Sequence, residues 1–263
     1  PPGDIRNCLV ALADEEPLMT ELFQYRFNGG SGPLQGHSFG NLLIAAMTNI
    51  TGDFEQAVKE TSKILAIRGR VLPATTDNVT LHAELEDGTI ADGETNIVKA
   101  GQPIRHIFVT PANAKPLEDA LQAIRYADAI VIGPGSVYTS VIPPLLVKGV
   151  AEAISESHAT KVYVCNVMTQ PGETDGFTAS EHVCAIANHA DRKLFNYVLV
   201  NRQVPKLELL EKYGEQGAEL VMPDIDKIRE MGYRPVIGDF ISQTEVVRHE
   251  PESLADAIVR LMY

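Results

Sequence analysis

Hydrophobic residues recur with the period of an α-helix through the first part of the chain. Over residues 4–70 the apolar side chains stand three or four positions apart, which predicts a helical segment. The stretch 39–47, which follows Ser38, is apolar on nearly every side, so we expect a buried helix there with Ser38 as its N-cap. Asp53 is expected to cap a further helix that ends at Ile67.

The period changes to two between residues 70 and 110. Alternating apolar positions predict a strand at Val79, Leu81, Ala83 and Leu85. Asp87-Gly88 is a typical hairpin turn, and a second strand is expected at Ile104–Thr110. These features predict a small antiparallel hairpin excursion, either inserted beside a main sheet or forming its edge.

Short apolar runs and helical patterns alternate from residue 115 to the end. Strands are predicted at Ala129–Ile132, Lys161–Cys165, Tyr197–Val200, Glu219–Met222 and Val236–Ile241. Helices are predicted to start at Pro116 and to follow Thr178, Lys206 and Ser253. At Pro143-Pro144 a short helix is predicted to end and a second one to begin.

This alternation is typical of the α/β class, with a doubly wound, Rossmann-like parallel sheet. We therefore treat residues 1–263 as a single domain with a helical part at 4–70, the hairpin at 70–110 and an α/β core at 115–263. Ligands of such sheets lie beyond the carboxyl ends of the strands.

Composition narrows the function classes. The formal charge of −13 and the lack of a basic run argue against a nucleic-acid partner or an anionic membrane surface. No apolar run approaches the roughly 20 residues that span a bilayer, so we expect no membrane insertion. The three widely spaced cysteines, Cys8, Cys165 and Cys184, offer no zinc-ligand spacing and favour a reducing compartment, the cytoplasm.

A glycine-rich turn follows the strand at Ala129–Ile132 and leads into a predicted helix. Gly133, Pro134, Gly135, Ser136 and Thr139 offer backbone N–H groups and hydroxyls that suit a phosphate, although the same pattern also makes an ordinary tight turn.

A second polar loop follows the strand at Lys161–Cys165. Its side chains suit a base or a ribose, and the predicted binding residues are Asn166, Thr169, Gln170, Gly172 and Glu173. Because neighbouring parallel strands end at one edge, the two loops together favour a nucleotide ligand over two unrelated polar loops.

The commonest nucleotide motifs are missing from these loops. No Gly-Lys-Ser/Thr triplet is present, which argues against a P-loop NTPase. The dinucleotide fingerprint lacks its third glycine and its acidic residue, which argues against a standard NAD dehydrogenase, although NAD still fits such a groove.

Four further polar residues are candidates. His37 and Asn41 stand four positions apart, so a helix would bring them to one side, but His37 also suits a capping position. Asp77 is a candidate catalytic residue and Mg²⁺ ligand, or a turn residue. Arg248 ends an apolar run and suits a phosphate, or it is a surface residue near a helix start.

Several motifs in this order resemble the bacterial gluconeogenesis-factor family, whose distant relatives are the 2-phospho-L-lactate transferases. The motifs are Pro2-Gly3-Asp4-Ile5-Arg6-Asn7, Gly36-His37-Ser38-Phe39-Gly40-Asn41-Leu42, Pro73-Ala74-Thr75-Thr76-Asp77, Ile132-Gly133-Pro134-Gly135-Ser136 and Asn166-Val167-Met168-Thr169-Gln170-Pro171-Gly172-Glu173-Thr174. The similarity covers essentially the whole chain.

The resemblance implies a cytoplasmic bacterial protein that acts in cell shape and envelope synthesis on gluconeogenic carbon sources. It implies binding of UDP-sugars such as UDP-N-acetylglucosamine rather than catalysis. Gly133 to Ser136 would hold the pyrophosphate, and Asn166, Thr169 and Gln170 would face the nucleoside. The alternative is an Mg²⁺-dependent transferase of a phospholactyl-type group from a GDP-linked donor.

One departure from the family concerns the start of the fold. Members open with a strand and a Gly-Gly-Gly-Thr-Gly phosphate loop, and this sequence contains neither. We expect that these parts are left out of the sequence rather than missing from the protein, since loss of a central strand would expose its neighbours. We also expect the protein to form a homo-oligomer, most simply a dimer.

Overall fold

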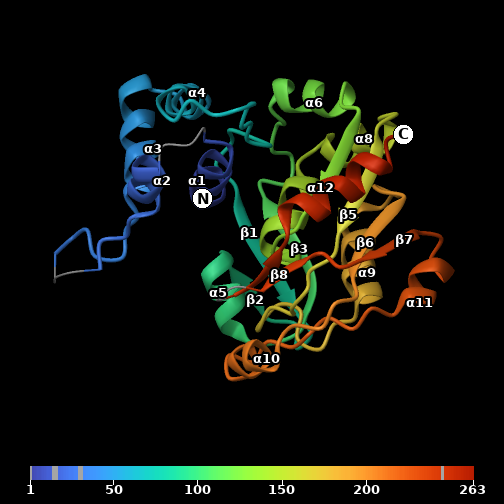
Figure 1. Ribbon diagram of the computed structural model, residues 1–263. Helices are drawn as coiled ribbons and strands as arrows, with labels where there is room; N and C mark the ends of the chain where they lie inside the picture. The colour runs from blue at the N-terminus through green and yellow to red at the C-terminus, as the bar shows by residue number, and fades with distance from the viewer. Residues whose placement is uncertain (1, 14–16, 29–31, 244–245) are drawn as a thin grey trace. The chain divides into compact units, whose positions relative to one another are not determined.

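The computed structural model describes residues 2–13, 17–28, 32–243 and 246–263 (Figure 1). They form two compact units, Pro1–Thr76 and Asp77–Tyr263, which are described separately below. The single domain over residues 1–263 stays a prediction.

The first unit is helical, as the period predicted. Its helices are α1 (Pro2–Leu12), α2 (Pro17–Gln24), α3 (Phe39–Thr51) and α4 (Phe54–Ile64). They enclose an apolar core made by Leu9, Phe23, Ile44, Val58, Leu65 and Val71. Asp53 caps α4 as expected by accepting a 2.7 Å hydrogen bond from the Gln56 N–H. The helix ends at Ile64 rather than Ile67, because Ala66 has a positive φ of 47° that an α-helix does not allow.

Helix α3 corrects one prediction. Ser38 is its N-cap and accepts a 3.3 Å hydrogen bond from the Asn41 N–H. The expected burial on nearly every side is wrong, since only Gly40 and Ile44 of α3 are buried. At Gly40 the backbone approaches α2 so closely that a Cβ atom would lie 2.8 Å from the Phe23 carbonyl oxygen.

The second unit starts with the antiparallel sheet that the sequence predicted. Its strand order is β2-β1-β3, with β1 at Thr80–Leu85, β2 at Ile90–Asp92 and β3 at Ile104–Thr110. The turn at Asp87-Gly88 joins β1 to β2, and α5 (Glu94–Ala100) connects β2 to β3. The sequence pattern did not reveal α5, which is short and half polar.

The main sheet is parallel and has the strand order β4-β5-β6-β7. Its strands are Ala129–Ile132, Thr160–Val164, Tyr197–Asn201 and Arg234–Gly238. The connecting helices are α6 (Glu118–Arg125), the π-helical η1 (Val137–Val141), α7 (Ile142–Leu146), α8 (Val150–Glu156), α9 (Ala179–Ala190), α10 (Leu207–Gly214) and α11 (Ile225–Glu230). A hairpin of β8 (Ile241–Gln243) and β9 (Val247–His249) and helix α12 (Pro251–Arg260) complete the unit.

Both faces of this sheet are covered, which confirms the α/β class. On one face α12 packs its apolar side, including Leu254 and Ile258, on Val162 and Leu199 (Figure 1). On the other face the buried Tyr163 packs on Phe195, with ring centroids 5.3 Å apart. Successive residues of a strand point to opposite faces, so β5 contributes to both cores.

Three local predictions differ from the structure. Residues 219–222 form no strand, and Leu220 makes only an isolated bridge with Met168. The change of helix predicted at Pro143-Pro144 comes two residues earlier, since η1 ends at Val141 and both prolines lie in the first turn of α7, where a missing N–H costs nothing. Helix α11 was not predicted, because it spans only six residues and has a single buried side chain.

Candidate functional site

The candidate site lies where β4 and β5 end at the carboxyl edge of the parallel sheet. Gly133 follows β4 with a positive φ of 74°, and a Cβ atom there would lie 3.2 Å from the Val164 carbonyl oxygen of β5. Glycine therefore allows this turn to pass directly over the neighbouring strand. The chain then enters η1 and α7, which run without a break from Val137 to Leu146.

Three hydrogen bonds join the two predicted loops. The Asn166 Nδ2 donates to the Gly135 carbonyl oxygen at 3.0 Å. The Gln170 Nε2 donates to the Ser136 Oγ at 2.6 Å, and the Thr139 Oγ1 donates to the Glu173 Oε1 at 2.9 Å. The structure thus brings the predicted residues of both loops together, while their role in ligand binding stays a prediction.

Two polar groups between these loops keep hydrogen-bonding capacity. The Ser136 hydroxyl accepts from Gln170, and its own hydrogen has no acceptor among the described residues. The Asn166 Oδ1 is buried and likewise lacks a partner within the described ranges. A buried acceptor without a partner is costly, which is typical of a position that a ligand or water satisfies.

Glu173 faces inward rather than toward an open groove. Its side chain is only 5% exposed. Burial raises the pKa of the carboxyl group above its usual range. The Thr139 hydroxyl and the backbone N–H groups of Thr139 and Tyr138 oppose that pKa shift by favouring the charged form, while Glu94 supports it.

Thr169 and Gly172 have structural reasons for their positions. Thr169 is buried, and its Oγ1 accepts a 2.9 Å hydrogen bond from the Glu219 N–H. Gly172 has a positive φ of 81°, and a Cβ atom there would lie 2.4 Å from the carbonyl oxygen of Val98 in α5. Both residues fix the second loop to neighbouring segments.

Arg248 is exposed on β9, two residues before Glu250, the N-cap of α12, so it is a surface residue near a helix start as the alternative predicted. Its neighbour Val247 belongs to an apolar cluster with Val167 and Met168 of the second loop. Burial lowers the pKa of His249 below its usual value, and a hydrogen bond to the Cys165 backbone opposes part of that shift. Because Cys165 directly follows β5, the exposed Arg248 is held close to the same sheet edge.

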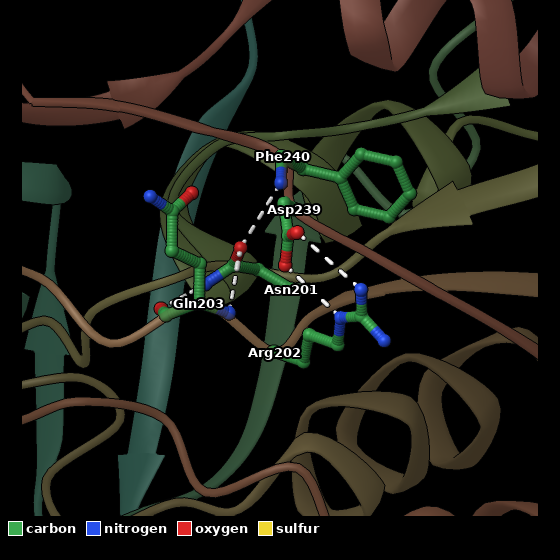
Figure 2. A network of polar contacts seen from close by, with 5 residues as sticks. All are labelled: Asn201, Arg202, Gln203, Asp239 and Phe240. Carbon is green, nitrogen blue, oxygen red and sulfur yellow. Dashed lines mark hydrogen bonds and ion pairs between the residues drawn. The ribbon is translucent and has the colours of Figure 1, made fainter.

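A network that the sequence did not reveal fixes the next strand end (Figure 2). Asn201, the last residue of β6, accepts from the Phe240 N–H at 3.1 Å and the Gln203 N–H at 3.3 Å, and donates to the Gln203 carbonyl oxygen at 2.7 Å. Arg202 and Asp239 form an exposed ion pair beside it at 3.0 Å. These contacts use the amide of Asn201 within the fold, so it is a structural residue.

The remaining candidates are His37 and Asn41 in the first unit and Asp77 at the start of the second. His37 precedes the Ser38 N-cap, so it is not on α3, and the expected one-turn spacing to Asn41 is wrong. Asp77 accepts a 2.7 Å hydrogen bond from the Lys115 N–H. Across the described part of the chain, no group of three His, Cys, Asp or Glu side chains is arranged to hold a metal ion. The role of Asp77 as a catalytic residue or Mg²⁺ ligand stays a prediction.

The described residues also bear on membrane insertion. No single helix among them is long and apolar enough to cross a bilayer. The segments Val137–Leu146 and Val150–Glu156 reach that length and composition only together, across a bend of 83°.

The fold and this edge define an α/β protein with a Rossmann-like sheet and a polar site beyond two strand ends. The family model described as 2-phospho-L-lactate transferase CofD matches residues 1–241, so the chain belongs to this family.

Relatives with the name gluconeogenesis factor are similar over nearly the whole chain. The protein of Halalkalibacterium halodurans is 51% identical over 260 residues, which cover 98% of this chain and 80% of that protein. The protein of Bacillus subtilis is 48% identical over 263 residues, covering 100% of this chain and 83% of that protein. The resemblance inferred from the motifs is thereby confirmed.

A solved structure has the same fold. The crystal structure of a UPF0052 family member from Bacillus halodurans matches with a TM-score of 0.94 and 50% identity. The match covers 98% of this chain and 83% of that chain.

Proposed function

We propose that the protein binds a UDP-sugar of the UDP-N-acetylglucosamine type at the carboxyl edge of β4 and β5. The observation that carries this proposal is the buried Asn166 Oδ1, together with the Ser136 hydroxyl hydrogen on the adjoining loop, since neither has a partner among the described residues. An acceptor and a donor at this edge suit a ligand that has both an N–H or hydroxyl group and phosphate oxygens, as a uridine nucleotide does.

Arg248 supports the anionic part of this ligand. Its strand is held at the end of β5 through Val247 and His249, and a guanidinium group binds phosphate with two parallel hydrogen bonds. The outer edge of β4 pairs with no strand in the described residues of the second unit, and Val131 on it is 43% exposed.

The test is calorimetric titration of the full chain with UDP-N-acetylglucosamine. We expect saturable binding that Ser136→Ala weakens by about tenfold, since a hydrogen bond to a charged group contributes roughly 1.5–3 kcal/mol. Ser155→Ala is the control, because Ser155 lies at the end of α8 that leads to the opposite edge of the sheet. Absence of binding by any uridine nucleotide would contradict the proposal.

The family match favours transfer of a phospholactyl-type group as a second candidate function. It predicts release of a nucleoside monophosphate from a nucleoside-diphosphate-linked donor, which mass spectrometry detects. This function would be excluded if the nucleotide-linked donor binds but releases no nucleoside monophosphate after prolonged incubation with hydroxyl compounds that could accept the phospholactyl group. The donor is followed with and without Mg²⁺, because the chain itself shows no metal-binding group of three ligands in its described part.

The names of the relatives support a cellular role. We propose that ligand binding links envelope synthesis and cell shape to growth on gluconeogenic carbon sources, in the cytoplasm. A deletion strain complemented with Ser136→Ala is expected to lose normal shape on such carbon sources and to keep it on glucose. We also propose that the protein is a homodimer, which light scattering tests separately.

A further inference from the structure

The N-terminal end of the helix that follows the glycine turn already holds an anion. Helix segments η1 and α7 begin with the Ser136 carbonyl oxygen, which accepts from the Ser140 and Val141 N–H groups. The first-turn N–H groups of Tyr138 and Thr139 instead face the carboxylate of Glu173, and the Thr139 hydroxyl donates to its Oε1 at 2.9 Å. A protein carboxylate therefore takes the position that the sequence suggested for a ligand phosphate.

The Glu173 carboxylate is buried and fixed in place at this helix end. Glu173 is 5% exposed, and its Oε2 is buried and accepts no hydrogen bond from the described residues. The second loop is also fixed close by, since Gly172 lies against the carbonyl group of Val98. The carboxylate thus has little room to leave the helix end, and it places a negative charge beside Thr139, three residues after Ser136.

We propose that Glu173 is a specificity-determining residue of the candidate site: its carboxylate fills the N-terminal end of the helix at Val137, so that phosphate groups of a ligand are excluded from that end. The ligand phosphates are then held on the Ser136 side, and additional negative charge near Thr139 is disfavoured. This inference rests on the proposed nucleotide site and concerns which anions that site accepts.

The test is titration of the wild-type chain and Glu173→Gln with uridine, UDP and pyrophosphate. Glutamine keeps an oxygen that accepts from Thr139, but it removes the negative charge. We expect UDP and pyrophosphate to bind Glu173→Gln about three- to tenfold more tightly than the wild type, because a repulsive charge within a few ångströms is lost. The affinity for uridine, which carries no phosphate, is expected to stay unchanged.

Two further variants separate charge from packing. Glu94→Gln removes an equal charge on α5 that Glu173 senses but that does not touch the helix end, and we expect less than about a twofold change for UDP. Thr139→Val keeps the Glu173 side chain and removes the hydroxyl that donates to it. We expect this variant to bind UDP more weakly and uridine equally well, the opposite of Glu173→Gln.

Either of two results would overturn the inference. One is an equal change in uridine and UDP affinity in Glu173→Gln, which would assign the residue a packing role alone. The other is an unchanged or weaker affinity for pyrophosphate. If neither protein binds any uridine compound, the proposed function fails, and the pyrophosphate titration still decides the role of Glu173.

Discussion

The Gln170 side chain donates a 2.6 Å hydrogen bond to the hydroxyl of Ser136, 34 residues earlier in the chain. The bond joins the glycine-rich turn after β4 to the polar loop after β5, and it leaves the Ser136 hydroxyl hydrogen for another acceptor. Together with the bonds from Asn166 and Thr139 it holds the two loops as one structure. The stability of this edge is therefore expected to depend on a few side chains at strand ends.

Asn201 is the first of these. Asn201→Ala removes the acceptor of the Phe240 N–H and both contacts to Gln203, and we expect it to lower the free energy of unfolding by about 2–4 kcal/mol. The measurement is urea unfolding followed by circular dichroism. Arg202→Gln is the matched control in the same network, since its ion pair with Asp239 is exposed and screened by solvent, and we expect it to lower the stability less. Equal losses in the two variants would contradict this assignment.

Gly172 tests the close contact between the second loop and α5. Gly172→Ala combines an unfavourable positive φ with a Cβ atom 2.4 Å from the Val98 carbonyl oxygen. Gly176→Ala has a similar φ of 70° but no atom within 4 Å of its Cβ, so it carries the backbone cost alone. We expect Gly172→Ala to be less stable than Gly176→Ala by about 1–3 kcal/mol in urea unfolding. Similar stabilities would show that the loop moves away freely.

Lys161 binds the end of a helix. Its ammonium group donates to the carbonyl oxygens of Ile154, Ser155 and Ser157 at 3.2, 2.9 and 2.9 Å, which completes the last turn of α8. Lys161→Met keeps the length of the side chain and removes these donors, so we expect a loss of about 1–3 kcal/mol in thermal or urea unfolding. Lys148→Met, on an exposed side chain in the same connection, is the control. The idea fails if the two variants unfold alike.

Buried histidines predict the response to acid. Burial lowers the pKa of His182, His189 and His249 below the usual 6.5. His189 shows why, since its Nε2 accepts the Ile107 N–H at 3.0 Å and cannot do so when protonated. As the pH falls below about 6.5 the unfolded chain takes up protons first, so stability is complete above that pH and is lost below it.

The measurement is the melting temperature between pH 7.5 and pH 5. We expect it to fall with the pH, and His189→Asn to reduce that fall by about 2–4 °C. His158→Asn, at an exposed position, is the control and is expected to leave the pH dependence unchanged. A pH dependence that is identical in both variants would remove His189 from this explanation.

Local patterns were sufficient for most of the secondary structure. The strands at Ala129–Ile132 and Ile104–Thr110 were predicted with their exact bounds, the first from a short apolar run and the second from an imperfect alternation of apolar and polar residues. The helix predicted after Thr178 was also confirmed, and Thr178 forms a capping box with Glu181. Prediction failed for α5 and for residues 219–222, where neighbouring elements rather than local period decide the conformation.

The candidate site divides in the same way. The sequence by itself determined that two polar loops follow successive strands of an α/β sheet, because apolar runs alternate with helical patterns. That the two strands are neighbours, with both loops at one edge, is seen in the folded sheet. Only the tertiary structure decided which side chains face inward. Thr139, Thr169 and Glu173 are residue types that often bind ligands. In the structure Thr139 bonds to Glu173, 34 residues away, and Thr169 bonds to Glu219, 50 residues away. Such long-range hydrogen bonds leave no periodic trace in the chain, so the direction of each side chain appears only when the loops are folded against each other.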